Sequence, residues 1–125
     1  MDTDANTSDL PLILLASDEL RLASNLQHAL RQQRFAVLLA PEYRDLESLA
    51  QSHHNAIVLL EVSRHQSVEA AVETAMRIKR SNSNRFVGYL ADRLLHNSGL
   101  AGDGIFPRNA QHLTEALRNH FGRIG

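Results

Sequence analysis

The chain has no cysteine, and no apolar stretch in its 125 residues is longer than about half a dozen positions. The lack of cysteine excludes disulfide bonds, thiolate chemistry and cysteine-based zinc sites. A membrane-spanning helix needs about 20 consecutive apolar residues, so none is expected here. The N-terminal stretch "MDTDANTSD" is acidic and polar, unlike a secretory signal peptide. We therefore expect a cytoplasmic protein.

Charge and short motifs exclude further classes of function. The 13 Lys and Arg residues are balanced by 14 Asp and Glu residues, which gives a net charge of −1. This balance does not indicate nucleic acid or an anionic membrane as a partner of the domain. The glycines form neither a GxGxxG nor a Walker motif, so dinucleotide and nucleoside triphosphate sites lack support. The seven histidines are scattered, which argues against a zinc site.

The pattern of apolar residues predicts one domain over residues 11–125, after a flexible polar tail at residues 1–10. Short, continuously apolar stretches alternate with amphipathic helical stretches, which is typical of a parallel sheet with helices on both faces. The predicted buried strands are "LPLILLA", "RFAVLLAP", "NAIVLLEV", "RFVGYLA" and "DGIF". The helix near residue 68 is predicted to bury Val68, Ala71, Val72, Ala75 and Met76. Asn109 is expected to cap the last helix.

Four strand ends share a recognisable pattern: "ASDE" after the first strand, "AIVLLEV" at the third, the pair Leu90 and Ala91 after the fourth, and "AGDGIFPRN" at the fifth. With these motifs the chain, from about residue 11 to 122, resembles the receiver domain of bacterial response regulators. This resemblance implies a flavodoxin-like α/β fold whose five-stranded parallel sheet has the order 2-1-3-4-5. The fourth helix, from Arg93 to Leu100, is expected to be short.

Several positions depart from the receiver pattern. Receivers place two acidic residues after the first strand, where this chain has Ser17 and Asp18. They end the third strand in a phosphoacceptor aspartate, where this chain has Glu61. Receivers follow the fourth strand with a hydroxyl residue and an alanine, where this chain has Leu90 and Ala91. Ile105 stands at the position of the aromatic residue that takes part in switching, and Arg108 stands at the position of the lysine.

Phosphoryl transfer to a carboxylate needs a well-placed nucleophile, a divalent cation and further ligands for the phosphoryl oxygens. Glu61 is one methylene too long, Ser17 removes a charge from the cation site, and Leu90 removes a hydroxyl. We therefore predict a degenerate, non-enzymatic receiver without a cofactor, with at most weak Mg²⁺ binding at Asp18. Two alternatives stay open: a phosphoacceptor that uses Glu61, and a small-molecule sensor that uses the crevice at the strand ends.

Asp18 and Glu61 each allow two interpretations. Asp18 is either a residual cation ligand or, with Ser17 as the other candidate, the N-cap of the first helix; the cap is favoured. Glu61 either pairs with Arg108 or is solvated at the strand end. Because two carboxylates in one crevice repel each other, we predict that the Arg108 guanidinium reaches Glu61 or Asp18.

The resemblance also implies a partner-binding face. In the family, the helix after the fourth strand, the fifth strand and the last helix usually form the output face. We expect a protein partner or a fused effector domain there, and a homodimer is an alternative. In this chain the face would carry His96, Arg108, Gln111, His112 and Glu115.

Overall fold

The structure is a computed structural model that describes residues 10–62, 68–91 and 104–121. Strands and helices alternate along most of this part of the chain. In chain order the elements are β1 (Leu12–Ala16), α2 (Leu20–Gln32), β2 (Ala36–Ala40), α3 (Tyr43–Ser52), β3 (Ile57–Glu61), α4 (Val68–Ser81), β4 (Val87–Leu90), β5 (Gly104–Phe106) and α5 (Ala110–Phe121).

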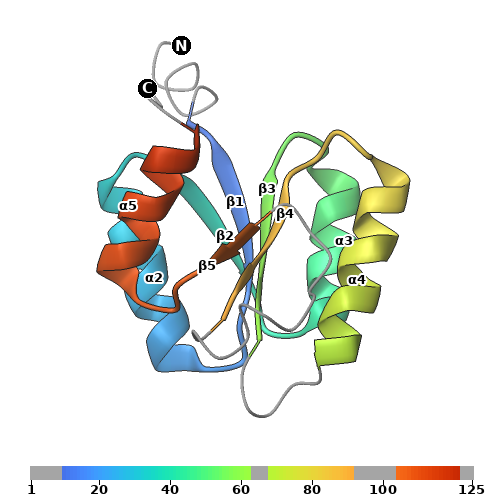
Figure 1. Cartoon of the computed structure of the whole chain (residues 1–125), viewed down its shortest axis with the longest axis horizontal. Coiled ribbons are helices and arrows are strands. Elements are labelled where there is room, and N and C mark those ends of the chain that lie inside the picture. The colour runs from blue at the N-terminus through green and yellow to red at the C-terminus, as the bar shows by residue number, and fades with distance from the viewer. Residues whose placement is uncertain (1–9, 63–67, 92–103, 122–125) are drawn as a thin grey trace.

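The strands form one parallel sheet in the order β2-β1-β3-β4-β5. This order confirms the predicted flavodoxin-like α/β fold. Figure 1 shows α2 and α5 on one face of the sheet and α3 and α4 on the other. Because the strands are parallel, their carboxyl ends meet at a single edge, the lower edge in Figure 1. In open α/β sheets this edge is where ligands bind.

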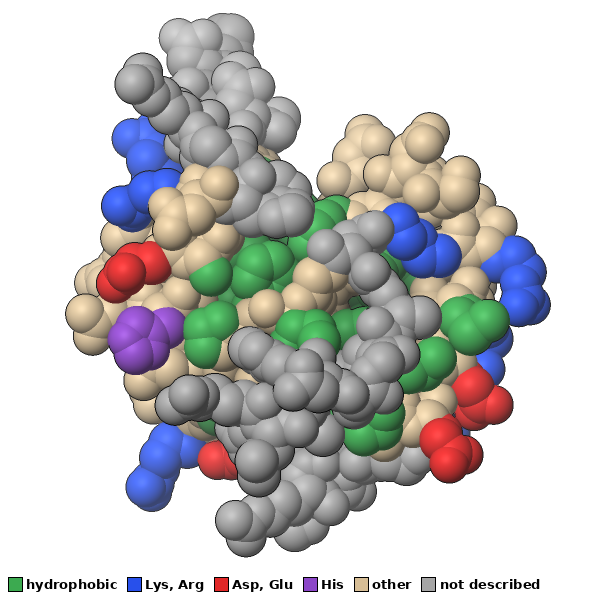
Figure 2. Space-filling model, viewed as in Figure 1, with side chains coloured by type: hydrophobic (Ala, Val, Ile, Leu, Met, Phe, Trp, Pro, Cys, Tyr) green, Lys and Arg blue, Asp and Glu red, His purple; other side chains and the backbone are tan. Residues whose placement is uncertain are grey.

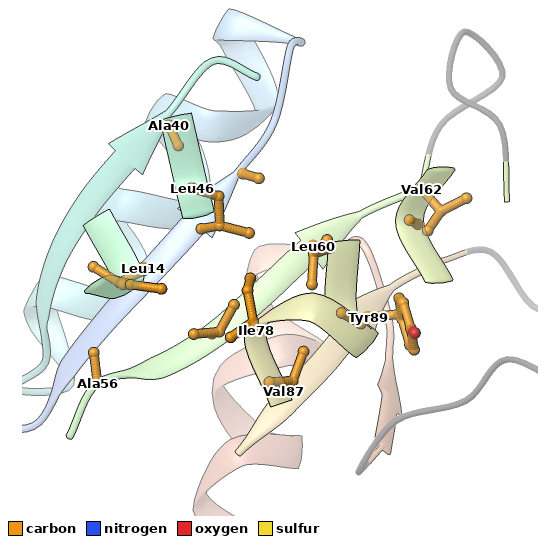
Figure 3. Close-up of a cluster of buried hydrophobic side chains, with 14 of the residues drawn as sticks. Leu14, Ala40, Leu46, Ala56, Leu60, Val62, Ile78, Val87 and Tyr89 are labelled. Carbon is orange, nitrogen blue, oxygen red and sulfur yellow. The ribbon is translucent and has the colours of Figure 1, made fainter. Parts of the chain in front are cut away.

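Two clusters of buried side chains fill the spaces between the sheet and its helices. Successive residues of one strand, such as Leu59 and Leu60, belong to different clusters because their side chains point to opposite faces. The cluster under α3 and α4 includes Leu14, Leu46, Leu60, Ile78, Val87 and Tyr89 (Figure 3). The cluster under α2 and α5 includes Ile13, Leu15, Leu30, Leu59, Phe106 and Leu117.

The second predicted strand is less buried than expected. β2 stands at the edge of the sheet, with β1 as its neighbour. Leu38 and Leu39 are each 37% exposed, so the prediction of a fully buried strand is wrong. An edge strand has a neighbour on one side only, which leaves part of its apolar side chains open to water.

The buried stripe of α4 also differs from the prediction. Met76 is 49% exposed, so its predicted inward position is wrong. The stripe instead includes Thr74 and Ile78. These positions continue the helical spacing that starts at Ala71, and the Thr74 hydroxyl is satisfied by donating to the Ala70 carbonyl at 2.8 Å.

The helix starts test two predicted caps. Asn109 precedes α5, and its Oδ1 accepts the N–H of His112 at 3.1 Å, which confirms that cap. α2 begins after Glu19 without a side-chain cap, so the predicted cap by Ser17 or Asp18 is wrong. The predicted fourth helix and nearly all of the N-terminal tail lie outside the described residues. Within the described part, every helix is too short or too polar to cross a membrane.

Candidate functional site

The carboxyl edge of the sheet brings together three side chains that are far apart in the sequence. Ser17 follows β1, Glu61 ends β3, and Arg108 comes two residues after the end of β5. Each stands two positions after a buried member of the cluster under α2 and α5. Residues two apart in a strand share a face, so the three side chains continue that cluster toward the edge of the sheet.

The Glu61 carboxylate is fully buried, with 0% of the residue exposed. Its Oε1 accepts a hydrogen bond from Ser17 Oγ at 2.5 Å. Its Oε2 accepts hydrogen bonds from Arg108 Nε at 2.9 Å and Nη2 at 2.6 Å. Both oxygens therefore have donors, and the negative charge has an adjacent cation, as a buried carboxylate requires.

The predicted contact of Arg108 with Glu61 is confirmed, and the alternative of a solvated Glu61 is wrong. Nε and Nη2 of Arg108 both donate to the same carboxylate oxygen, Oε2, so these two hydrogen bonds do not span both oxygens of Glu61. Its Nη2 also lies 3.2 Å from Glu19 Oε2. The Arg108 side chain is 20% exposed and that of Glu19 is 55% exposed, so this second contact forms the outer rim of the site.

Ser17 has a structural role at this site. It is nearly buried, at 4% exposed, and its hydroxyl also accepts the backbone N–H of Glu19 at 3.3 Å. The same hydroxyl thus donates to Glu61 and fixes the turn before α2. Sequence analysis missed both this role and the contact of Glu19, although "ASDE" contains both residues.

Tyr43, at the start of α3, is a site residue that the sequence analysis did not single out. Its hydroxyl donates to the backbone carbonyl of Glu61 at 2.8 Å. Burial raises the pKa of the Tyr43 phenol, and the negative charges of Glu61 and Asp18 raise it further. The sequence signal was its position just after β2, at the same edge as the other strand ends.

Asp18 does not take part in the ion pair between Arg108 and Glu61. Its side chain is exposed, and within the described residues it makes no hydrogen bond to Arg108 or to the start of α2. Its influence on Tyr43 places its charge near the site. Its role as a residual cation ligand stays a prediction.

The remaining predicted positions are packed rather than open. Leu90 is paired with Glu61 in the register of β3 and β4, and it is fully buried in the cluster under α2 and α5. Ala91 is buried in the opposite cluster, against which Ile105 is partly buried. The matching of these residues to the receiver's hydroxyl, alanine and aromatic positions stays a prediction.

The residues of the predicted output face lie in different environments. Gln111, His112 and Glu115 are exposed on α5. Arg108 turns instead toward Glu61 and contributes to the ion pair. His96 lies outside the described residues.

Comparison with known proteins gives a structural relationship. No family model matches the chain. A search of curated proteins also finds no match. Among solved structures, response regulator TrrA from Thermotoga maritima, in complex with Mg²⁺–BeF, matches with a TM-score of 0.74 and 20% identity; the match covers 88% of this chain and 98% of that one. The non-phosphorylated HemR receiver domain from Leptospira biflexa has a TM-score of 0.72 and 18% identity, with 90% and 95% covered.

A response regulator receiver domain protein from Clostridium thermocellum is also similar, with a TM-score of 0.68, 21% identity, and 88% and 93% of the two chains covered. At such identities the similarity concerns the arrangement of the backbone. The chain therefore has the flavodoxin-like fold of CheY-like response regulator receiver domains.

Proposed function

We propose that this chain is a degenerate receiver domain of a cytoplasmic signalling pathway, which acts by protein–protein interaction and does not depend on phosphorylation. The observation that carries the proposal is the state of Glu61. This residue occupies the end of β3, it is fully buried, and both of its oxygens already accept hydrogen bonds. A nucleophile must present a free oxygen in line with phosphorus, so Glu61 would first have to leave Ser17 and Arg108.

The donor set at the strand ends also fits Mg²⁺ poorly. Mg²⁺ requires oxygen ligands in near-octahedral geometry. The oxygens of Glu61 are engaged, and the Arg108 guanidinium beside them repels a second cation. Within the described part of the chain, no group of three or more His, Asp or Glu side chains is placed to hold a metal ion. We expect Mg²⁺ to bind no tighter than millimolar, as judged by calorimetry.

In this proposal, the internal ion pair replaces the contact that a receiver's lysine makes with an acyl phosphate. Arg108 is held by Glu61, which ties the segment after β5 to the end of β3. A partner or effector domain would then recognise a constant surface. The exposed Gln111, His112 and Glu115 of α5 are candidates for that surface.

Intact-mass spectrometry after incubation with Mg²⁺ and acetyl phosphate tests the proposal. We expect no stable increment of one phosphate, while an ordinary receiver domain treated in parallel becomes labelled. An increment that disappears in Glu61→Gln would instead support the alternative of a phosphoacceptor with an altered site. A melting temperature that rises with a specific metabolite would support the sensor alternative.

A further inference from the structure

A pocket of about 110 Å³ lies between α3 and α4. Its apolar lining comes from Ala50 and Ile78, and Arg85, which precedes β4, lies at its end. The pocket therefore opens toward the amino edge of the sheet, opposite the Glu61 site. Since one water takes up about 30 Å³ in the liquid, the pocket can hold a small ligand.

Arg85 is the unusual residue of this pocket. It is 6% exposed, and its Nη2 donates to the His53 carbonyl at 2.9 Å. Its Nε is buried without a hydrogen-bond partner, and no carboxylate of the described residues forms a salt bridge with it. Burial lowers the pKa of the guanidinium, which reflects the cost of holding this charge away from water. A buried guanidinium with an unused donor is expected to gain from an anion nearby.

The other charges at the pocket do not balance Arg85. Glu47 is the acidic residue of the lining, and it is already engaged by Arg77 at 2.8 Å. Lys79 adds a further positive charge, since its Nζ donates to the Arg85 carbonyl at 2.8 Å. Figure 2 shows Lys and Arg side chains on the right of the view, where Figure 1 places α4, and others on the left. The pocket therefore has an excess of positive charge.

We propose that this pocket binds a small oxyanion, a carboxylate or a phosphate, with Arg85 as the counter-charge. Gln51 and His54 line the same pocket and can donate further hydrogen bonds. The apolar part of the lining, from Ala50 and Ile78, would accommodate the carbon atoms of an organic acid. The site is separate from the Glu61 site, so a ligand here would act on the α3–α4 face independently of it.

An NMR titration tests this proposal with acetate and inorganic phosphate as probes, at constant ionic strength set with sodium chloride. We expect amide shifts that saturate and are confined to residues 50–55 and 77–86 with at least one probe. Shifts that remain linear in probe concentration, or that centre on the amides of Ser17 and Glu61, would overturn the proposal.

A pair of matched variants makes the test specific without removing Arg85, whose bond to His53 supports the fold. Ser81 and Ser52 are the exposed last residues of α4 and α3, and Ser81 lines the pocket whereas Ser52 does not. Ser81→Glu supplies an internal carboxylate and should abolish the saturable shifts. Ser52→Glu makes the same change of charge at an equivalent helix end and should leave them unchanged. Equal binding by both variants would contradict a site at Arg85.

Discussion

A carboxylate buried as fully as that of Glu61 is stable only when its charge is balanced and its oxygens accept hydrogen bonds. Ser17 and Arg108 meet both conditions. The 20% exposure of Arg108 leaves the cation partly hydrated, and Glu19 offers it a second partner. Loss of Arg108 should therefore be more harmful than loss of the charge on Glu61.

Arg108→Ala is expected to lower the free energy of unfolding by about 1–3 kcal/mol, because Glu61 keeps its buried charge without a cation. Urea denaturation measures this loss. Arg44→Ala is the matched control, since Arg44 pairs with Glu42 at 2.9 Å with both side chains largely exposed. That surface pair should contribute about 0–1 kcal/mol. Glu61→Gln should cost less than Arg108→Ala, and equal losses for Arg108→Ala and Arg44→Ala would mean that packing alone holds the site.

Tyr43→Phe should change how stability depends on alkaline pH. The folded-state pKa of Tyr43 is raised, mainly by burial, so the folded protein retains this proton after the unfolded chain has begun to release it. The stabilisation is thus complete below about pH 10, the usual tyrosine value, and is lost as the pH rises above it. Thermal unfolding between pH 9 and 11 should show a steeper loss in the wild type than in Tyr43→Phe. The other tyrosine, Tyr89, is present in both proteins, so parallel curves would contradict the role of Tyr43.

The part of the site that depends only on the positions of the strand ends was predictable from the sequence. Parallel strands bring their carboxyl ends to one edge, which was enough to predict that Arg108 reaches Glu61 or Asp18. Hydrogen bonds to Glu61 from Ser17 and Tyr43 were not predictable, because they depend on side-chain orientation and on where α2 and α3 begin. The expected cap of α2 failed for the same reason: the Ser17 hydroxyl is directed to Glu61 instead.

At the scale of the elements, the contact between β4 and β5 determines where Arg108 lies. Gly88 and Gly104 are paired in this register. Beside them, the ring centroids of Phe86 and Phe106 lie 5.9 Å apart. A Cβ on Gly88 would come within 3.0 Å of both rings and 3.2 Å of the Gly104 carbonyl oxygen. The close approach of these strands therefore depends on the missing side chain at position 88.

Gly88→Ala should accordingly destabilise the protein by about 1–3 kcal/mol, through overpacking between the strands. Gly104→Ala is the natural control, because a Cβ there would meet the ring of Phe106 at 3.3 Å and that of Phe86 at 3.6 Å. We expect a smaller loss for this variant in the same urea denaturation experiment. A Gly88→Ala protein as stable as Gly104→Ala would show that the rings can move aside.

Element type was predictable because continuous apolar stretches and helical spacing are strong signals in this chain. The exposure of individual side chains within an element was less predictable. Nothing in "AVLLA" distinguishes an edge strand from a central one, so the exposure of Leu38 and Leu39 follows only from the sheet order. On α4, two overlapping apolar stripes compete, and packing selects the one that contains Ile78 rather than Met76.

For the whole molecule, the fold agrees with that of the three solved structures described above, with TM-scores of 0.68–0.74, although the sequence identities are only 18–21%. The fold needs buried strands in the right order, and this requirement leaves the residues at the strand ends free to change. The proposed function depends on those residues. The ion pair connects the end of β3 to the segment after β5, across β4, in the protein as it stands.

The most direct test of this account compares amide NMR spectra of the protein alone and with Mg²⁺ and beryllofluoride, a mimic of the phosphoryl group. If Glu61 is permanently paired with Arg108, the amides of Ser17, Glu61 and residues 104–110 should not shift beyond the effect of Mg²⁺ alone. Large shifts that spread from Glu61 to α5 would show that the pair opens, that the site accepts a phosphoryl group, and that the domain still switches.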